Sequence, residues 1–125
     1  MNVAHREIDG IEILDLRGRL TAGTESGNLS EAVTKLVSEG KNNLILNLKQ
    51  LDLLDSSGLG MLVVCLAAIQ QQGGVLKLAN AQRHMELFVL TKLTAVVELF
   101  DNERDAVNSF FPDRAIKRFE VSEYA

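Results

Sequence analysis

Leu53-Leu54-Asp55-Ser56-Ser57-Gly58-Leu59-Gly60 is the stretch of this 125-residue sequence that decides its fold. It joins an apolar run over residues 43–48, typical of a buried strand, to a second apolar run over residues 61–69, typical of a helix. A polar turn in this position can cap the helix, and it can leave a hydroxyl exposed for chemistry or contact. The stretch therefore predicts a strand-to-helix junction with two serines of undecided role.

Strand and helix signals alternate on both sides of this junction. Before it, the sequence predicts a hairpin over residues 3–16 that turns at Asp9-Gly10, and a helix over residues 28–39 that stops at Gly40. After it, the predicted elements are a helix that ends near Gln72, a strand over residues 75–79, a helix over residues 82–99 and a last helix over residues 103–111.

This alternation predicts the fold class and the domain organisation. Strands that alternate with helices imply crossover connections and an at least partly parallel sheet. We expect an α/β fold with a small mixed sheet of four to five strands and about four helices. The domain is predicted to span residues 1–112, and residues 113–125 form a C-terminal tail of uncertain structure.

Composition narrows the function classes. The formal net charge is -4 and Lys and Arg do not cluster, which disfavours a direct nucleic-acid partner or an anionic membrane surface. The longest apolar run is far short of the roughly 20 residues of a membrane helix, and the first residues contain no apolar signal region. The single cysteine, Cys65, excludes an intrachain disulfide and is predicted to be buried. We therefore expect a cytoplasmic protein without membrane insertion.

The serines of the turn lack the companions that catalysis requires. A nucleophilic serine needs a base within hydrogen-bond reach. The two histidines, His5 and His84, are predicted to lie at the surface or its boundary, and the turn lacks the Gly-x-Ser-x-Gly pattern of hydrolases. No Cys/His spacing indicates a metal site. The sequence therefore predicts no catalytic residue, no metal and no cofactor, and a protein that is not an enzyme.

Two further roles for the turn differ in how well its charges suit them. A helix N-terminus attracts phosphate, but the nearby Asp52 and Asp55 would repel it and no lysine lies near the turn. A serine that accepts a phosphoryl group gains a charge of about -1.5 to -2, which would weaken a partner docked at that surface. The plain alternative is a helix cap that contributes roughly 1 kcal/mol.

The whole pattern resembles a known family. Leu44-Ile45-Leu46-Asn47-Leu48, the motif at residues 54–60 and the following helix that ends at Gly73-Gly74 resemble the STAS family, which includes bacterial anti-sigma factor antagonists. Leu16-Arg17-Gly18-Arg19-Leu20 is similar to a family strand that ends in Gly-x-Leu, and residues 76–80 are similar to a later strand. The resemblance covers roughly residues 8–111.

The resemblance implies a function for the turn. In antagonists of this type, the serine directly after the aspartate is phosphorylated by the anti-sigma factor, a serine kinase of the histidine-kinase-like ATPase fold. The unphosphorylated form binds that kinase and frees the sigma factor, and a separate phosphatase resets the cycle. Ser56 would be the phosphorylated residue. The partner-binding residues implied by the motif are Asp55, Ser56, Ser57, Gly58, Leu59, Met61 and Thr21.

Thr21 departs from the family pattern, which often has an aspartate after Gly-x-Leu. It is a further hydroxyl that is either phosphorylated or simply solvated. The rival function is a non-phosphorylated STAS subunit of a stress-signalling complex or of a lipid-transport ATPase. The helix after the turn is equally open to two interpretations: packing on both sides through Ala67 and Ala68, or a docking patch that includes Met61 and Val64.

Overall fold

A mixed sheet of five strands, in the order β1-β2-β3-β4-β5, forms the centre of the molecule. The structure is a computed structural model and describes residues 1–22 and 26–114. Strand β1 is antiparallel to β2, and the other neighbouring strands are parallel. The strands are β1 (Asn2–Ile8), β2 (Ile11–Leu20), β3 (Asn43–Leu54), β4 (Val75–Ala79) and β5 (Glu98–Phe100).

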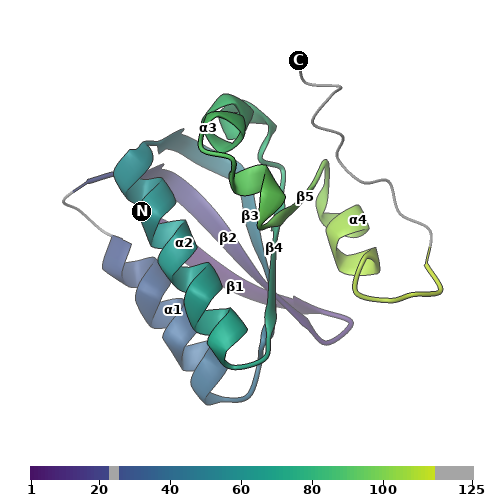
Figure 1. The fold of residues 1–125 in the computed structure, drawn as a ribbon. Helices are drawn as coiled ribbons and strands as arrows, with labels where there is room; N and C mark the ends of the chain where they lie inside the picture. Colours follow the sequence, from purple (N-terminus) through teal and green to yellow (C-terminus); the bar gives the residue numbers. More distant parts are fainter. Residues whose placement is uncertain (23–25, 115–125) are drawn as a thin grey trace.

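Helices cover both faces of this sheet. Strands β2 to β5 follow one another across the sheet in the order of the sequence. Right-handed crossovers between successive parallel strands therefore place the connecting helices on one face. Figure 1 shows α1 and α2 side by side on that face, with α4 apart from them near β5. The described helices are α1 (Ser26–Ser38), α2 (Ser56–Gln71), α3 (Met85–Leu90) and α4 (Glu103–Asn108), with short 3-10 turns η1 (Gln82–His84) and η2 (Leu93–Ala95) around α3.

These elements confirm the predicted α/β fold class. No described helix combines the length and the hydropathy needed to cross a membrane. The division into a domain of residues 1–112 and a tail of residues 113–125 stays a prediction, because the tail lies outside the described residues from 115 onward.

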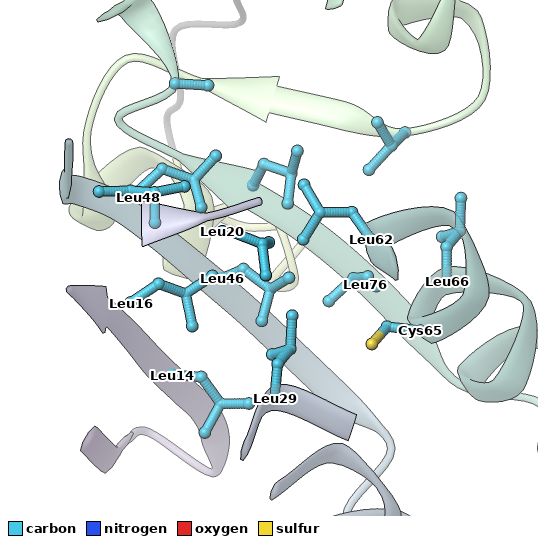
Figure 2. Packing of buried hydrophobic residues seen from close by; sticks show 14 of the residues in the cluster. Leu14, Leu16, Leu20, Leu29, Leu46, Leu48, Leu62, Cys65, Leu66 and Leu76 are labelled. Atoms are coloured by element: carbon cyan, nitrogen blue, oxygen red, sulfur yellow. The ribbon is translucent and has the colours of Figure 1, made fainter. Parts of the chain in front are cut away.

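Leucines on the face of α1, α2 and α3 build the main core. Alternate residues of a strand point to the same face of a sheet, and in β2 and β3 most of those on this face are buried leucines. Figure 2 shows leucines of β2, β3 and β4 directed toward Leu29 of α1 and toward Leu62, Cys65 and Leu66 of α2. Burying one leucine contributes about 1.5–3 kcal/mol, so this layer holds the helices on the sheet.

Cys65 lies within this main core and is 3% exposed, which confirms the prediction of a buried thiol. Burial raises the pKa of the Cys65 thiol to about 11. The thiol therefore stays protonated at neutral pH. A nucleophilic or metal-binding cysteine acts as a thiolate, so neither role suits Cys65.

A second, smaller core lies on the opposite face of the sheet, under α4. Ile13, Ile45 and Phe100 are buried there against Ala106 and Val107 of α4. The isoleucines alternate along β2 and β3 with the leucines of the main core, which is why one strand can serve both cores.

Lys77 of β4 reaches into this second core and is 6% exposed. Its ammonium group donates to the Ser109 hydroxyl at 2.8 Å and lies 4.2 Å from the centre of the Phe110 ring. These contacts satisfy a charge that would be costly to bury alone. They also hold the residues that follow α4 against β4.

The prediction of one helix over residues 82–99 is wrong. The segment is divided into η1, α3, η2 and the strand β5, which pairs with β4. Lys92 follows α3 with a left-handed backbone, φ 61°. The β-branched residues Val96 and Val97 then favour an extended chain. The apolar spacing over the whole segment resembled a helix because α3 and β5 bury residues in the same core.

Several predicted boundaries also change. Strand β2 continues to Leu20 rather than Leu16, and β3 to Leu54 rather than Leu48, because the two strands stay paired across two register shifts. Helix α1 begins at Ser26, and α4 ends at Asn108 rather than Phe111.

A row of polar side chains crosses the α4 face of the sheet beside the second core. Arg6 Nε donates to Asp15 Oδ2 at 2.6 Å, Asn47 Nδ2 donates to Asp15 Oδ1 at 2.8 Å, and Asn80 Nδ2 donates to Asn47 Oδ1 at 2.8 Å. The guanidinium of Arg6 also pairs with Glu103 of α4. The hydrogen bond from Arg6, followed by that from Asn47, holds the pKa of Asp15 below its ordinary value.

Asp15→Asn is expected to lower the free energy of unfolding at neutral pH by about 1.5 kcal/mol, the low end for hydrogen bonds to a charged group. Because the folded-state pKa of Asp15 is depressed, its stabilisation is present when the carboxylate is ionised. It is lost as the pH falls through that pKa, below about 3.9. Urea unfolding at neutral pH and at about pH 3 should therefore show a difference between wild type and variant that shrinks in acid.

Asp113→Asn is the matched control, since Asp113 is exposed and the substitution removes the same charge. It should leave the free energy of unfolding nearly unchanged. A difference for Asp15→Asn that is equal at both pH values would contradict the role assigned to the ionised carboxylate.

Candidate functional site

Asp55 joins three parts of the molecule at the carboxyl edge of the sheet. It is the N-cap of α2, and its Oδ1 accepts from Gly58 N at 2.8 Å. Its Oδ2 accepts from Ala22 N at 3.2 Å, and its own N–H donates to Leu20 O at 3.4 Å. The carboxylate therefore fastens the start of α2 to the chain that leaves β2.

The same hydrogen bonds keep Asp55 ionised. The pKa of Asp55 is lowered, first by the hydrogen bond from Gly58 N–H and then by the one from Ala22 N–H. Backbone donors favour the charged form of a carboxylate because they solvate it in place of water. A fixed negative charge therefore stands beside the two serines of the turn.

Gly58 allows α2 to begin directly against the end of β2. A Cβ atom at Gly58 would lie 1.9 Å from Leu20 O and 2.7 Å from Leu20 C, which are backbone atoms that cannot turn away. A Cβ atom at Gly60, two residues later, would have no neighbour within 4 Å. The first glycine is thus required by close packing, whereas the second is exposed.

Ser56 and Ser57 are the first two residues of α2, and both are exposed. Within the described part of the chain, neither side-chain hydroxyl makes a hydrogen bond, because the cap is supplied by Asp55. The structure thus separates the two roles that a turn serine can have. Asp55 caps the helix, and both hydroxyls stand free on the surface.

An uncharged stripe of α2 extends from these serines. Residues 56–71 contain no Asp, Glu, Lys or Arg. Gly60, Val64 and Ala67 follow Ser56 and Ser57 on the exposed side at helical spacing. Val64 is 58% exposed and the adjoining Val63 is 41% exposed. We call Ser56, Ser57, Gly60, Val63, Val64 and Ala67 the α2 stripe.

The exposure of the α2 stripe bears on the two interpretations of this helix. Packing on both sides through Ala67 and Ala68 is wrong for this chain, since both are exposed. Val64 is exposed, as a docking patch requires. Met61, which was expected beside it, is partly buried and packs against the main core. The opposite side of α2 buries Leu59, Leu62, Cys65, Leu66 and Ile69.

The other predicted site residues lie close to the turn but differ in exposure. Thr21 is half-buried and follows β2, next to Ala22, whose N–H binds Asp55. Gly58 is buried, and Leu59 is 4% exposed in the main core. The structure therefore brings Thr21, Asp55, Ser56 and Ser57 together at one surface, while Gly58 and Leu59 lie beneath it.

Two features near the turn were not found from the sequence. Leu53 is 49% exposed although it stands in an apolar strand. Because the neighbouring Leu54 is buried in the main core, alternation along β3 directs Leu53 to the opposite face of the sheet. The second feature is the hydrogen bond from the backbone N–H of Ala22 to Asp55. Almost any residue type can donate such a bond, so the sequence does not reveal it.

Both histidines are engaged elsewhere. His5 lies in β1, and its Nε2 donates to the buried Glu12 at 2.7 Å. His84 Nε2 donates to Leu51 O at 2.7 Å, and the residue is 9% exposed. The expectation that His84 lies at the surface or its boundary is therefore wrong. Among the described residues, no three His, Cys, Asp or Glu side chains gather as metal ligands would.

The chain has relatives among known proteins. A family model described as the STAS domain matches residues 2–106. The anti-sigma-B factor antagonist of Bacillus subtilis (strain 168) is 35% identical to the chain over 72 residues, which is 57% of this chain. The match spans 65% of that relative, just under two thirds of its length.

Solved structures share the fold. An anti-sigma factor antagonist from Mycobacterium paratuberculosis superposes with a TM-score of 0.73 and 21% identity, covering 86% of this chain and 92% of that chain. The Bacillus cell fate determinant SpoIIAA in its phosphorylated form has a TM-score of 0.67 and 17% identity, covering 87% of this chain and 99% of that chain. At these identities the two comparisons establish the architecture.

Gly58→Ala is expected to destabilise the fold by about 2–3 kcal/mol, since the added methyl group can be accommodated only if α2 moves away from the end of β2. Gly60→Ala is the matched control on the same helix turn. It should be neutral or stabilising by about 0.5–1 kcal/mol, because alanine restricts the unfolded chain and meets no neighbour. Chemical denaturation of both variants measures the difference. Equal stability of the two variants would refute the close contact at Gly58.

Proposed function

This chain belongs to the STAS domain family, and on that basis we propose that it is an anti-sigma factor antagonist whose binding is ended by phosphorylation of Ser56. Its partner is an anti-sigma factor serine kinase of the histidine-kinase-like ATPase fold. Capture of that kinase frees a sigma factor and so regulates transcription. The curated relative from Bacillus subtilis carries the name of such an antagonist, which supports this function class.

The observation that carries the proposal is the position of Ser56. It is the first residue of α2, its hydroxyl is exposed, and the helix cap that a serine can supply comes instead from Asp55. A kinase can therefore take the Ser56 hydroxyl into its active site without breaking a hydrogen bond of the fold. Ser57 shares the exposure, and the order Asp-Ser in the family motif selects Ser56.

The α2 stripe explains why one phosphoryl group would switch binding. Its surface is uncharged and includes Val63 and Val64, so burial against a partner is favourable. A phosphoryl group on Ser56 adds a charge of about -1.5 to -2 at one end of that surface, beside the ionised Asp55. The charge must then lose water when the partner docks, and the partner loses affinity.

The fold itself tolerates the modification. The free N–H groups and the dipole at the start of a helix favour a phosphate there by about 0.3–1 kcal/mol. Phosphorylation would thus change the surface and leave the domain folded. Gly58 and Leu59 stabilise the turn beneath the surface: Gly58 packs against the end of β2, and Leu59 is buried in the main core. Thr21 and Met61 border the surface, and a phosphatase that removes the group would reset the cycle in the cytoplasm.

The rival function is a STAS subunit that is never phosphorylated, in a stress-signalling complex or with a lipid-transport ATPase. Thr21 favours it, since family switches often carry an aspartate there. In this rival function the α2 stripe would also contact the partner, but Ser56 would not be phosphorylated. The two functions therefore differ in what happens to Ser56.

The decisive experiment incubates the protein with ATP and each anti-sigma factor kinase from its own source, and maps the phosphate by mass spectrometry. Ser56→Ala should abolish phosphate incorporation and keep kinase binding. Ser56→Asp should bind at least about 10-fold more weakly, a loss of about 1.4 kcal/mol. Binding is measured by calorimetry.

Ser57→Ala and Ser57→Asp are the matched controls one residue away. Ser57→Ala should still be phosphorylated, and Ser57→Asp tests whether any added charge at the turn weakens binding. Phosphate found on Ser57 would show that Ser57, and not Ser56, is the phosphorylated residue. Full kinase binding by Ser56→Asp, or no phosphate with any kinase, would refute the switch and favour the rival.

A further inference from the structure

The α4 face of the sheet contains a hollow that the proposed function does not use. It has a volume of about 300 Å³, and its lining consists of Leu16 and the polar residues Arg6, Asp15, Arg17, Asn47, Lys49 and Gln50. We call it the sheet hollow. It lies on the face opposite α2, because Asp15 and Asn47 alternate with the leucines of the main core.

An irregularity in the pairing of β2 and β3 builds the wall of the sheet hollow. Asp15 pairs with Asn47 and Arg17 with Gln50, so β3 inserts one extra residue over this interval. Leu48 and Leu51, on either side, are both fully buried, whereas Lys49 and Gln50 are both exposed and both line the hollow. In a regular strand these two neighbours would point to opposite faces. The bulge turns both to the same side.

The floor of the sheet hollow is already held in place. Asp15 is bound by Arg6 and by Asn47, and Asn47 accepts from Asn80 and from Lys49 N at 3.2 Å. Arg6 is occupied by Asp15 and Glu103. The polar groups of the floor thus satisfy one another, and a ligand would meet a preformed surface rather than one that must be ordered.

Two exposed cations stand at the wall, and the charge of one of them, Arg17, also helps to hold the pKa of Asp15 low. Within the described residues, neither the Arg17 guanidinium nor the Lys49 ammonium forms a salt bridge, and Gln50 makes no side-chain hydrogen bond. A planar guanidinium and an ammonium on either side of an amide donor match the oxygens of a phosphoryl group. These cations stand in a chain of net charge -4, so their juxtaposition is not a general basic surface.

From this arrangement we propose that the sheet hollow binds a small phosphorylated molecule, with its phosphoryl oxygens on Arg17 and Lys49 and with Gln50 as a further donor. The volume of about 300 Å³ corresponds to the smallest ligand pockets, which favours a compact phosphate or diphosphate over a polymer. Nearby Glu103 and Asp15 carry negative charge, but Arg6 lies between them and neutralises part of it.

The probe for this site is inorganic pyrophosphate, titrated into the uniformly ¹⁵N-labelled protein at neutral pH and constant ionic strength. The amide signals of residues 15–18 and 47–51 should shift and saturate at about millimolar pyrophosphate. Arg17→Gln with Lys49→Gln should weaken binding at least about 10-fold. Both side chains are exposed, so the double variant should give the same well-dispersed spectrum as wild type.

Two controls make the result decisive. Lys35→Gln with Lys41→Gln removes the same total charge from exposed positions outside the hollow and should bind as wild type does. Ser56→Asp tests the other anion-attracting feature, the start of α2, and should also leave pyrophosphate binding unchanged. Absence of saturable shifts, shifts centred on residues 55–58, or an equal loss of binding in the two double variants would overturn the proposal. Because the hollow does not involve Ser56, failure here leaves the phosphorylation switch standing, and the reverse also holds.

Discussion

The contact between the start of α2 and the end of β2 is the constraint on which the surface of this protein depends. Gly58 brings the helix against the Leu20 carbonyl, and Asp55 binds both the helix and the chain that leaves β2. A side chain at position 58 would force α2 away from the end of β2. Ser56 and Ser57 lie between Asp55 and Gly58 and are exposed at a fixed position on the surface. Their hydroxyls make no contribution to the contact between α2 and β2, so a modification of either hydroxyl would leave that contact in place.

Because α2 carries no charged residue, a charge added at Ser56 or Ser57 would change its surface strongly. A helix that is uncharged along its length and apolar on its inner side would ordinarily be buried all round. Here the outer side remains exposed, with two valines in the α2 stripe. Such a surface is favourable to cover and sensitive to a single added charge at its end. The proposed switch depends on that property.

The sequence was most informative where local and global signals agreed. The strand-to-helix junction, the buried Cys65 and the first four strands of the mixed sheet followed from spacing and turn residues. Sequence spacing failed over residues 82–99, where the chain enters the left-handed region at Lys92 and pairs with β4 only through tertiary contact. It also failed at His84, whose burial depends on a backbone carbonyl 33 residues away in the chain. The bulge at Lys49 and Gln50 was hidden because it depends on register with another strand.

Lys77 sets a limit on how far the chain can be shortened. Its ammonium group binds Ser109 and lies over the Phe110 ring, both beyond the last residue of α4. A chain that stopped at the end of α4 would keep its last helix and lose these contacts to a buried cation. Ser109 and Phe110, the two residues after α4, therefore belong to the part of the chain that packs against the sheet. A buried charge thus gives two residues outside any helix or strand a part in holding the sheet together.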